Sequence, residues 1–202
     1  MKHFILMVRF FTRIPLKGNS VSKEGDFGKG LPYFPLVGLV IGTFNLLAFY
    51  FFSFFGNMTV TTVFWVFANI IITGALHIDG LADTCDGLLS YRDKDRMLEI
   101  MKDSRIGTNG VIAILMDIVM RISLMLSVSA NIRPYAILIS PVLGKTLMLV
   151  LIWMTPYARK SGIGGLFYKD ITKKYMIVGV LSGILFTTFI YSWRLYPILI
   201  LC

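Results

Sequence analysis

Five long apolar runs limit what this chain can fold into more than any other feature of its sequence. The runs cover residues 36–55, 60–76, 111–130, 136–154 and 175–191. A helix of about 20 residues is about 30 Å long, which matches the hydrocarbon core of a bilayer. The runs therefore predict membrane-spanning helices, and we expect an all-α, polytopic transmembrane helical bundle of about five to six spans.

The composition supports lipid as the solvent of this chain. Of its 202 residues, 56% are hydrophobic and 15% are charged, whereas soluble domains carry about 25% charged residues. The two cysteines, Cys85 and Cys202, belong to no CxxC pair and indicate no disulfide framework. We find no linker or internal repeat, so we treat residues 1–202 as a single integral membrane domain.

The basic residues predict the orientation of the spans. The net charge is +9, and sixteen of the twenty Lys and Arg residues fall in segments 1–30, 77–110 and 155–174. Alternating spans place these segments on one side, and loops rich in Lys and Arg remain in the cytoplasm. We therefore expect a multi-pass protein of the cell's inner or plasma membrane, with segment 1–30 cytoplasmic or interfacial. Because the charge lies in short loops, we expect a bilayer and no nucleic acid as partner.

Shorter features lie beside the spans. Residues 3–16 are apolar but contain two arginines, which is typical of an interfacial or half-buried helix. Residues 93–102 predict a short amphipathic helix, and the apolar tail 197–202 is too short to span a bilayer. Inside the third run, Asp117 and Arg121 are four residues apart, and we expect them to neutralise each other.

Lys145 lies inside the fourth apolar run and has no evident partner in the sequence. A charged side chain within a span faces a polar cavity or extends to the membrane surface. Both alternatives remain open for Lys145.

The chemistry of the sequence concentrates in HIDGLADTCDG, residues 77–87. On a helix, Asp79, Asp83 and Asp86 lie within about 60° of one another. Three carboxylates on one stripe repel each other unless a cation neutralises them, and Mg²⁺ prefers carboxylate oxygens. The stripe therefore predicts a Mg²⁺ site on the cytoplasmic side, in segment 77–110. The alternatives are a solvated acidic turn and carboxylates paired with Arg92, Arg96 or Arg105.

The segment that follows adds a possible phosphate site. Gly107 and Gly110 bracket small polar residues just before a span, where backbone N–H groups at a helix N-terminus could receive a phosphate. Lys102 and Arg105 add positive charge, and Asp103 adds a fourth carboxylate. Beside the aspartate stripe, these residues predict half of a site for Mg²⁺ and pyrophosphate.

His77 is a separate question, because on a helix it lies about 120–180° from the three aspartates. It therefore faces elsewhere unless the helix breaks there. One alternative is a direct role in the site, and the other is a histidine at a helix end.

Four blocks of the sequence resemble the cobalamin synthase family, the adenosylcobinamide-GDP ribazoletransferases. The blocks are FFTRIP at 10–15, YFPLVG at 33–38, HIDGLADTCDGL at 77–88 and IMKDSRIGT at 100–108. A looser match follows at PYAR, residues 156–159, with Gly162. The blocks occur in the family's order, and the two central ones are highly specific in combination.

The resemblance implies a membrane enzyme that uses Mg²⁺ to join adenosylcobinamide-GDP and α-ribazole, or α-ribazole 5′-phosphate. The products are adenosylcobalamin, or its phosphate, and GMP, in the last step of nucleotide-loop assembly. By matching position, the implied metal ligands are Asp79, Asp83, Asp86 and Asp103. The implied substrate contacts are Arg13, Lys102, Arg105 and Arg159. The candidate catalytic residues are Asp83, Asp86 and His77, and either His77 or an aspartate serves as the general base.

Members of the family usually continue into a polar block resembling GGxTGD and a further span, whereas this sequence ends at Cys202. This keeps open an inactive, truncated remnant or a scaffold. A second alternative is an enzyme like the CDP-alcohol phosphotransferases, whose pattern also opens with Asp-Gly but expects Ala-Arg where this chain has Ala82-Asp83. A third is a cation transporter using Asp79, Asp83 and Asp117. The protein could be an oligomer in any of these cases.

Overall fold

The computed structural model describes residues 1–17, 25–159, 162–169 and 171–193, and this part of the chain is helical without a strand. The helices are α1 (Lys2–Phe11), η1 (Gly28–Tyr33), α2 (Phe34–Ser53), α3 (Met58–Thr73), α4 (Leu76–Leu88), α5 (Lys94–Ile100), α6 (Thr108–Ser127), α7 (Arg133–Met154), η2 (Ile163–Phe167) and α8 (Lys173–Trp193). The two labelled η are 3₁₀ helices.

Four of the described segments are long and apolar enough to cross a bilayer. They are Gly28–Ser53, Thr108–Ser127, Arg133–Met154 and Lys173–Ser192. A fifth crossing arises only if α3 and α4 are counted together, and these two helices are bent by 89°. The all-α, polytopic fold class is therefore confirmed. The predicted tail at 197–202 lies outside the described residues.

The apolar run at 60–76 forms parts of two helices, where a single straight span was predicted. α3 ends in a Schellman motif, in which Gly74 N–H donates to the Ile71 carbonyl (3.0 Å) and Ala75 N–H to the Ile70 carbonyl (2.9 Å). Gly74 and Ala75 both have left-handed backbone angles, with φ of 62° and 61°. α4 begins directly afterwards in a new direction. A Gly-Ala step within an apolar run gave no sign of this break.

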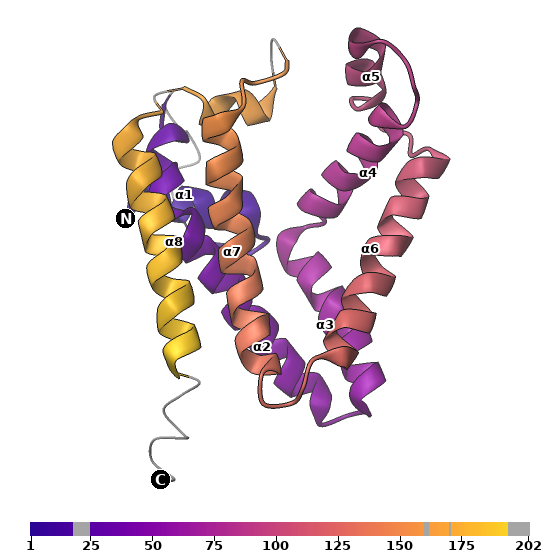
Figure 1. The fold of residues 1–202 in the computed structure, drawn as a ribbon, viewed down its shortest axis with the longest axis vertical. Helices are drawn as coiled ribbons and strands as arrows, with labels where there is room; N and C mark the ends of the chain where they lie inside the picture. Colours follow the sequence, from indigo (N-terminus) through magenta and orange to yellow (C-terminus); the bar gives the residue numbers. More distant parts are fainter. Residues whose placement is uncertain (18–24, 160–161, 170, 194–202) are drawn as a thin grey trace.

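The helices form two arms that meet at one end of the molecule (Figure 1). α1, α2, α7 and α8 make one arm, and α3, α4, α5 and α6 make the other. α4 lies along the first half of α6, and α3 lies along its second half. The segments that join α4 to α6 and α7 to α8 lie at the same end, and the α2–α3 and α6–α7 connections lie at the opposite end.

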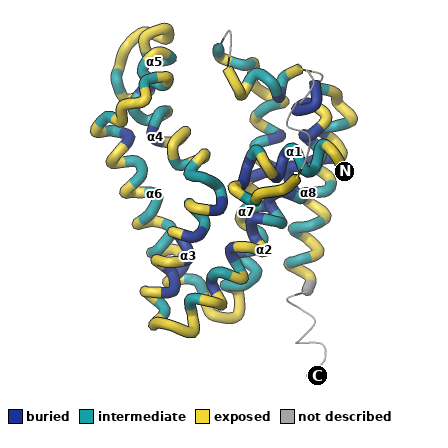
Figure 2. The backbone as a smooth tube through the Cα atoms, turned by 180° about the vertical axis from the view of Figure 1, so that it is seen from behind, coloured by how far each residue is buried: buried dark blue, intermediate teal, exposed yellow. Residues whose placement is uncertain are grey.

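The best-buried core lies where α1 meets α2 and α7. Phe11 of α1 packs edge-to-face against Phe34 of α2, with ring centroids 5.0 Å apart, and Leu149 of α7 belongs to the same cluster. Figure 2 shows buried backbone gathered in this arm, whereas exposed positions follow the outward sides of α3 and α6. α1, predicted to be interfacial or half-buried, also buries Met7 and Val8 fully. The exposed sides are apolar, as lipid-facing helices require.

Two glycines allow α2 and α7 to approach closely. A Cβ atom on Gly38 would lie 2.6 Å from the Pro141 carbonyl oxygen, and one on Gly42 would lie 2.8 Å from the Leu138 carbonyl oxygen. Both neighbours are backbone atoms of α7, which cannot rotate away as a side chain can. Small residues at such crossings are a common device of membrane helix pairs.

We predict that Gly38→Ala destabilises the fold by about 1–3 kcal/mol, because α2 and α7 must move apart to admit the methyl group. The measurement is the free energy of unfolding in detergent micelles. Gly144→Ala on α7 is the matched control, since a Cβ atom there meets nothing within 4 Å. Equal stability of the Gly38→Ala variant and the wild type would contradict the close-approach argument.

Candidate active site

The aspartates of the predicted metal stripe all lie on α4, which starts at the break after α3. Asp79 is exposed, and Asp83 and Asp86 are half-buried. Asp83 lies close enough to Asp79, Asp86 and Arg159 to interact electrostatically with all three. Arg159 follows α7 on the other arm, and its guanidinium donates to the Met101 carbonyl at the end of α5 (3.4 Å). The stripe therefore has one cationic neighbour that comes from across the molecule.

Asp86 also holds α4 against the start of α6, a role that the sequence analysis did not predict. Its carboxylate accepts hydrogen bonds from the backbone N–H groups of Gly107 (2.7 Å) and Gly110 (2.8 Å). The first turn of a helix has unpaired N–H groups and a partial positive charge. α6 has no side-chain cap of its own at Gly107, so Asp86 supplies the anion. Phosphate binding at this N-terminus stays a prediction.

The two glycines of this turn make the contact possible. A Cβ atom on Gly107 would lie 2.5 Å from Asp86 Oδ1, and one on Gly110 would overlap Asp86 Oδ2. The Gly-x-x-Gly pattern, taken from the sequence as a phosphate-binding signal, therefore has a structural explanation in this fold. It lets a neighbouring carboxylate reach the backbone of α6.

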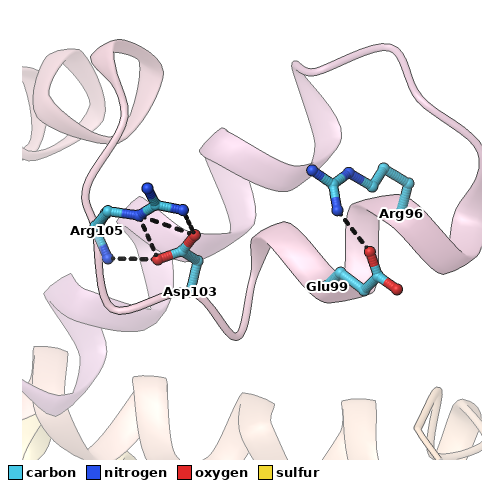
Figure 3. A network of polar contacts seen from close by, with 4 residues as sticks. All are labelled: Arg96, Glu99, Asp103 and Arg105. Atoms are coloured by element: carbon cyan, nitrogen blue, oxygen red, sulfur yellow. Dashed lines mark hydrogen bonds and ion pairs between the residues drawn. The ribbon is translucent and has the colours of Figure 1, made fainter.

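The turn between α5 and α6 holds three of the predicted site residues. Asp103 and Arg105 pair with each other, and the Arg105 Nη2–Asp103 Oδ2 distance is 2.6 Å (Figure 3). A separate pair, Arg96 and Glu99, lies on α5 nearby (2.7 Å). Lys102 is exposed on the same turn. To bind a metal ion or a phosphate, Asp103 and Arg105 must exchange this mutual contact for the ligand.

The Arg105 side chain and its backbone N–H donate hydrogen bonds that lower the pKa of Asp103 to about 2. The unfolded value is about 3.9. A depressed carboxyl pKa stabilises the fold above the unfolded pKa, and this contribution is lost as the pH falls through about 2.

We predict that the Asp103 carboxyl titrates near pH 2 in the wild type and near its ordinary pKa in Arg105→Gln. The carboxyl carbon shift of labelled aspartate, followed by NMR, measures this. Arg96→Gln should move the midpoint far less, because Arg96 acts on Asp103 only from a distance. Identical titrations of Asp103 in the wild type and Arg105→Gln would show that the pair does not persist in solution.

A second group of predicted residues meets at the α3–α4 break. His77 Nε2 lies 2.6 Å from Nζ of Lys145 on α7. Its ring stacks on Phe11 of α1, with centroids 5.9 Å apart, and Lys145 Nζ lies 3.4 Å from the centre of the Phe11 ring. Lys145 is therefore buried between an imidazole and a phenyl ring. His77 contacts α7, whereas Asp86 contacts α6, so His77 and the stripe face different neighbours.

Arg13 lies on the other side of the same break. Its backbone N–H donates to the Ile72 carbonyl (2.7 Å), and its side chain lies so close to Gly74 that a Cβ atom there would overlap Nε. Of the predicted substrate contacts, Arg13 thus lies at the break, near the turn that carries His77. Lys102 and Arg105 lie beyond the far end of α4, in the α5–α6 turn.

A pocket of about 440 Å³ lies between α2, α3, α6 and α7, beside the first turn of α4. Arg121 on its wall contacts Asp117 (2.9 Å), which confirms the predicted ion pair, and also donates to Asn69 (3.0 Å). Asn45 and Asn69, both on the wall, were not identified from the sequence. The available signal was an amide side chain in the middle of each of the first two apolar runs.

The carboxylates do not form a ready-made metal centre. Among the described residues, no group of three or more His, Cys, Asp or Glu side chains is placed to hold a metal ion. Asp86 accepts hydrogen bonds from α6, and Asp103 is paired with Arg105. Asp79 and Asp83 are therefore the two carboxylates of the predicted metal set that such contacts do not already occupy. Two such carboxylates fit Mg²⁺, because this ion binds through one or two carboxylates and keeps its other positions for waters and phosphates.

We predict that two Asp→Asn changes on α4 differ in their effect on the free energy of unfolding. Asp86→Asn should cost about 1–3 kcal/mol, since it removes a charged acceptor from two backbone N–H groups. Asp79→Asn should cost nothing or stabilise, because the Asp79 side chain makes no hydrogen bond within the described chain and repels Asp83. Unfolding in detergent measures both changes, and equal destabilisation by the two variants would contradict the assigned role of Asp86.

Comparison with known proteins gives a consistent result. The chain matches the family model described as cobalamin-5-phosphate synthase over residues 3–202. It is 48% identical to the adenosylcobinamide-GDP ribazoletransferase of Clostridium novyi, over 91% of this chain and 74% of that protein. It is 37% identical to the enzyme of that name from Clostridioides difficile, over 94% of this chain and 74% of the relative. No solved structure matches the chain.

Proposed function

The chain belongs to the cobalamin-5-phosphate synthase family, and on that basis we propose that it acts as an adenosylcobinamide-GDP ribazoletransferase dependent on Mg²⁺. The relatives' name gives the reaction class, a transfer at a substituted phosphate. The reaction joins adenosylcobinamide-GDP to α-ribazole, or to its 5′-phosphate, and completes the nucleotide loop of cobalamin or of its phosphate. We assign this reaction to a site on the basis of one observation, which is the carboxylate stripe of α4 beside Arg159.

The bond changes define what the site must do. A ribazole hydroxyl forms a bond to the phosphorus attached to the corrinoid, and the bond from that phosphorus to the GMP oxygen breaks. The hydroxyl loses its proton, and GMP leaves with the bridging oxygen. A bound Mg²⁺ would neutralise the charge that develops on the leaving phosphate.

The residues of this chain have separate roles at the site. Asp79 and Asp83 are the carboxylates available to hold the ion, and Asp86 fixes α4 by bonding to the first turn of α6. Arg159 lies near Asp83 and can contact a diphosphate held there. Arg13 supplies a further cation at the break. We place this site on the cytoplasmic side, since sixteen of the twenty Lys and Arg residues lie in the segments assigned to that side.

A cation transporter is the second candidate, because transporters bind ions at discontinuous helices and α3–α4 is such a pair. One of the three aspartates expected to bind the transported ion argues against a transporter. Asp117 lies 2.9 Å from Arg121 and is neutralised there, so it does not join Asp79 and Asp83. Family membership also favours the transferase.

We predict that the purified full chain in lipid nanodiscs forms GMP and adenosylcobalamin from adenosylcobinamide-GDP and α-ribazole with Mg²⁺, and not with EDTA. Asp83→Asn should lower the rate by about 10²–10³-fold, the usual effect of losing one electrostatic contact to a transition state. Asp95→Asn, on the exposed surface of α5, is the matched control and should keep the wild-type rate. A wild-type rate for Asp83→Asn, or turnover in EDTA, would overturn the metal site.

A further inference from the structure

Two buried polar atoms on the wall of the pocket between α2, α3, α6 and α7 have no partner within the described chain. Asn45 is 1% exposed and Trp65 is 8% exposed, and neither Asn45 Oδ1 nor Trp65 Nε1 makes a hydrogen bond there. Burying a polar atom without a partner is unfavourable, and native proteins contain few such atoms. Both residues line the pocket. These two atoms are themselves almost inaccessible, so an occupant would pair with them, as one acceptor and one donor, only after a small rotation of each side chain.

The cations of the pocket differ in how they are balanced. Arg121 is paired with Asp117 (2.9 Å). Lys145 is 4% exposed, and the described part of the chain places no carboxylate within salt-bridge distance of it. Its neighbours are the His77 imidazole and the Phe11 ring. A ligand oxygen at this end of the pocket would meet N–H donors of Lys145 Nζ that no carboxylate of the described chain accepts.

One part of the wall is apolar and suits a flat ring, beside the polar side chains of Asn69, Thr73 and Ser140. Ile41, Ile70, Pro141 and Met148 line the pocket with the Trp65 indole. Its volume of about 440 Å³ lies within the range of about 300–1,000 Å³ that is usual for small-molecule sites. A ring system with few polar atoms, joined to a small group that carries hydroxyls, matches this lining.

Only one of the two substrates of the proposed function has this chemistry. In the form without a 5′-phosphate, α-ribazole is an uncharged nucleoside with a flat, largely apolar base, which can enter at membrane depth at little electrostatic cost. Adenosylcobinamide-GDP is far larger, and its diphosphate requires the cations and the metal ion of the stripe. The pocket therefore fits the acceptor substrate and not the donor.

The position of the pocket supports the same occupant. His77 and Ile78 on its wall are directly followed by Asp79. Each helical residue advances about 1.5 Å, so Asp83 lies about 9 Å beyond His77 along the axis of α4. A nucleoside with its base in the pocket can extend its ribose along α4 towards the carboxylates.

We propose that this pocket is the acceptor subsite, in which Asn45, Trp65 and Lys145 bind α-ribazole. The subsite rests on the proposed function, because the choice of ligand comes from the reaction. Its residues are binding residues and are separate from the carboxylates that hold the metal ion.

The test uses Asn45→Leu, which keeps the number of side-chain heavy atoms, and Trp65→Phe, which keeps an aromatic ring. Both changes are made in the full chain, and together they remove the two unpaired atoms. We expect KM for α-ribazole to rise about 3- to 10-fold in each variant, the effect of one lost hydrogen bond. KM for adenosylcobinamide-GDP should not change. Thermal stability should stay close to that of the wild type, because the removal of an unpaired buried polar atom offsets the change of side-chain volume in each variant. A misfolded variant would instead lose stability.

Asn131→Leu makes the same chemical change on the exposed α6–α7 connection and should leave both KM values unchanged. Wild-type KM for α-ribazole in both pocket variants, or an equal rise in both KM values, would overturn the subsite while leaving the transferase intact.

If the wild type forms no GMP, the proposed function fails, and the subsite is then tested by binding alone. Equilibrium dialysis of α-ribazole against wild type, Asn45→Leu and Trp65→Phe is the measurement. Binding to the wild type that weakens in both pocket variants supports the subsite. Absence of binding to the wild type, or equal binding to all three, overturns it.

Discussion

The structure depends on how the last turn of α3 satisfies its backbone carbonyls at the break before α4. An unpaired carbonyl at membrane depth costs several kcal/mol, so a helix can break there only if donors are present. Ile70 and Ile71 receive the N–H groups of Ala75 and Gly74, and Ile72 receives the N–H of Arg13. The chain can therefore turn by 89° and begin α4 inside the bundle. Both the pocket and the carboxylate stripe follow from that new direction.

The site is divided between two arms, which explains why it needs residues so distant in the sequence. The stripe belongs to the arm of α3–α6, whereas Lys145 and Arg159 come from the arm that contains α7. Besides their junction at one end, the arms contact each other through Lys145 and His77 at the break, and through Arg159 and the Met101 carbonyl near α5. A substrate bound between them would contact both arms, so substrate binding and the relative position of the arms are linked.

The sequence predicted those parts of the fold that depend on local spacing. Apolar length located the spans, the four-residue step of Asp117 and Arg121 indicated an ion pair, and α5 was expected from its amphipathic pattern. Partners far apart in the chain left no local pattern. His77 and Lys145 are separated by 68 residues, and Asp86 and Gly110 by 24. The glycines after Arg105 illustrate the limit, because one pattern serves both for a phosphate and for a neighbouring carboxylate.

The position of α1 matters for anyone who handles this protein. Lys2 and His3 both contact Asp26 (2.8 and 3.1 Å), and at the end of the same helix Phe11 lies against Lys145 Nζ. The N-terminal helix is thus a support of the interior. An affinity tag or fluorescent protein fused to Met1 would be attached to that support. A loss of turnover in such a fusion would then reflect a displaced α1 and not a defect in the site residues.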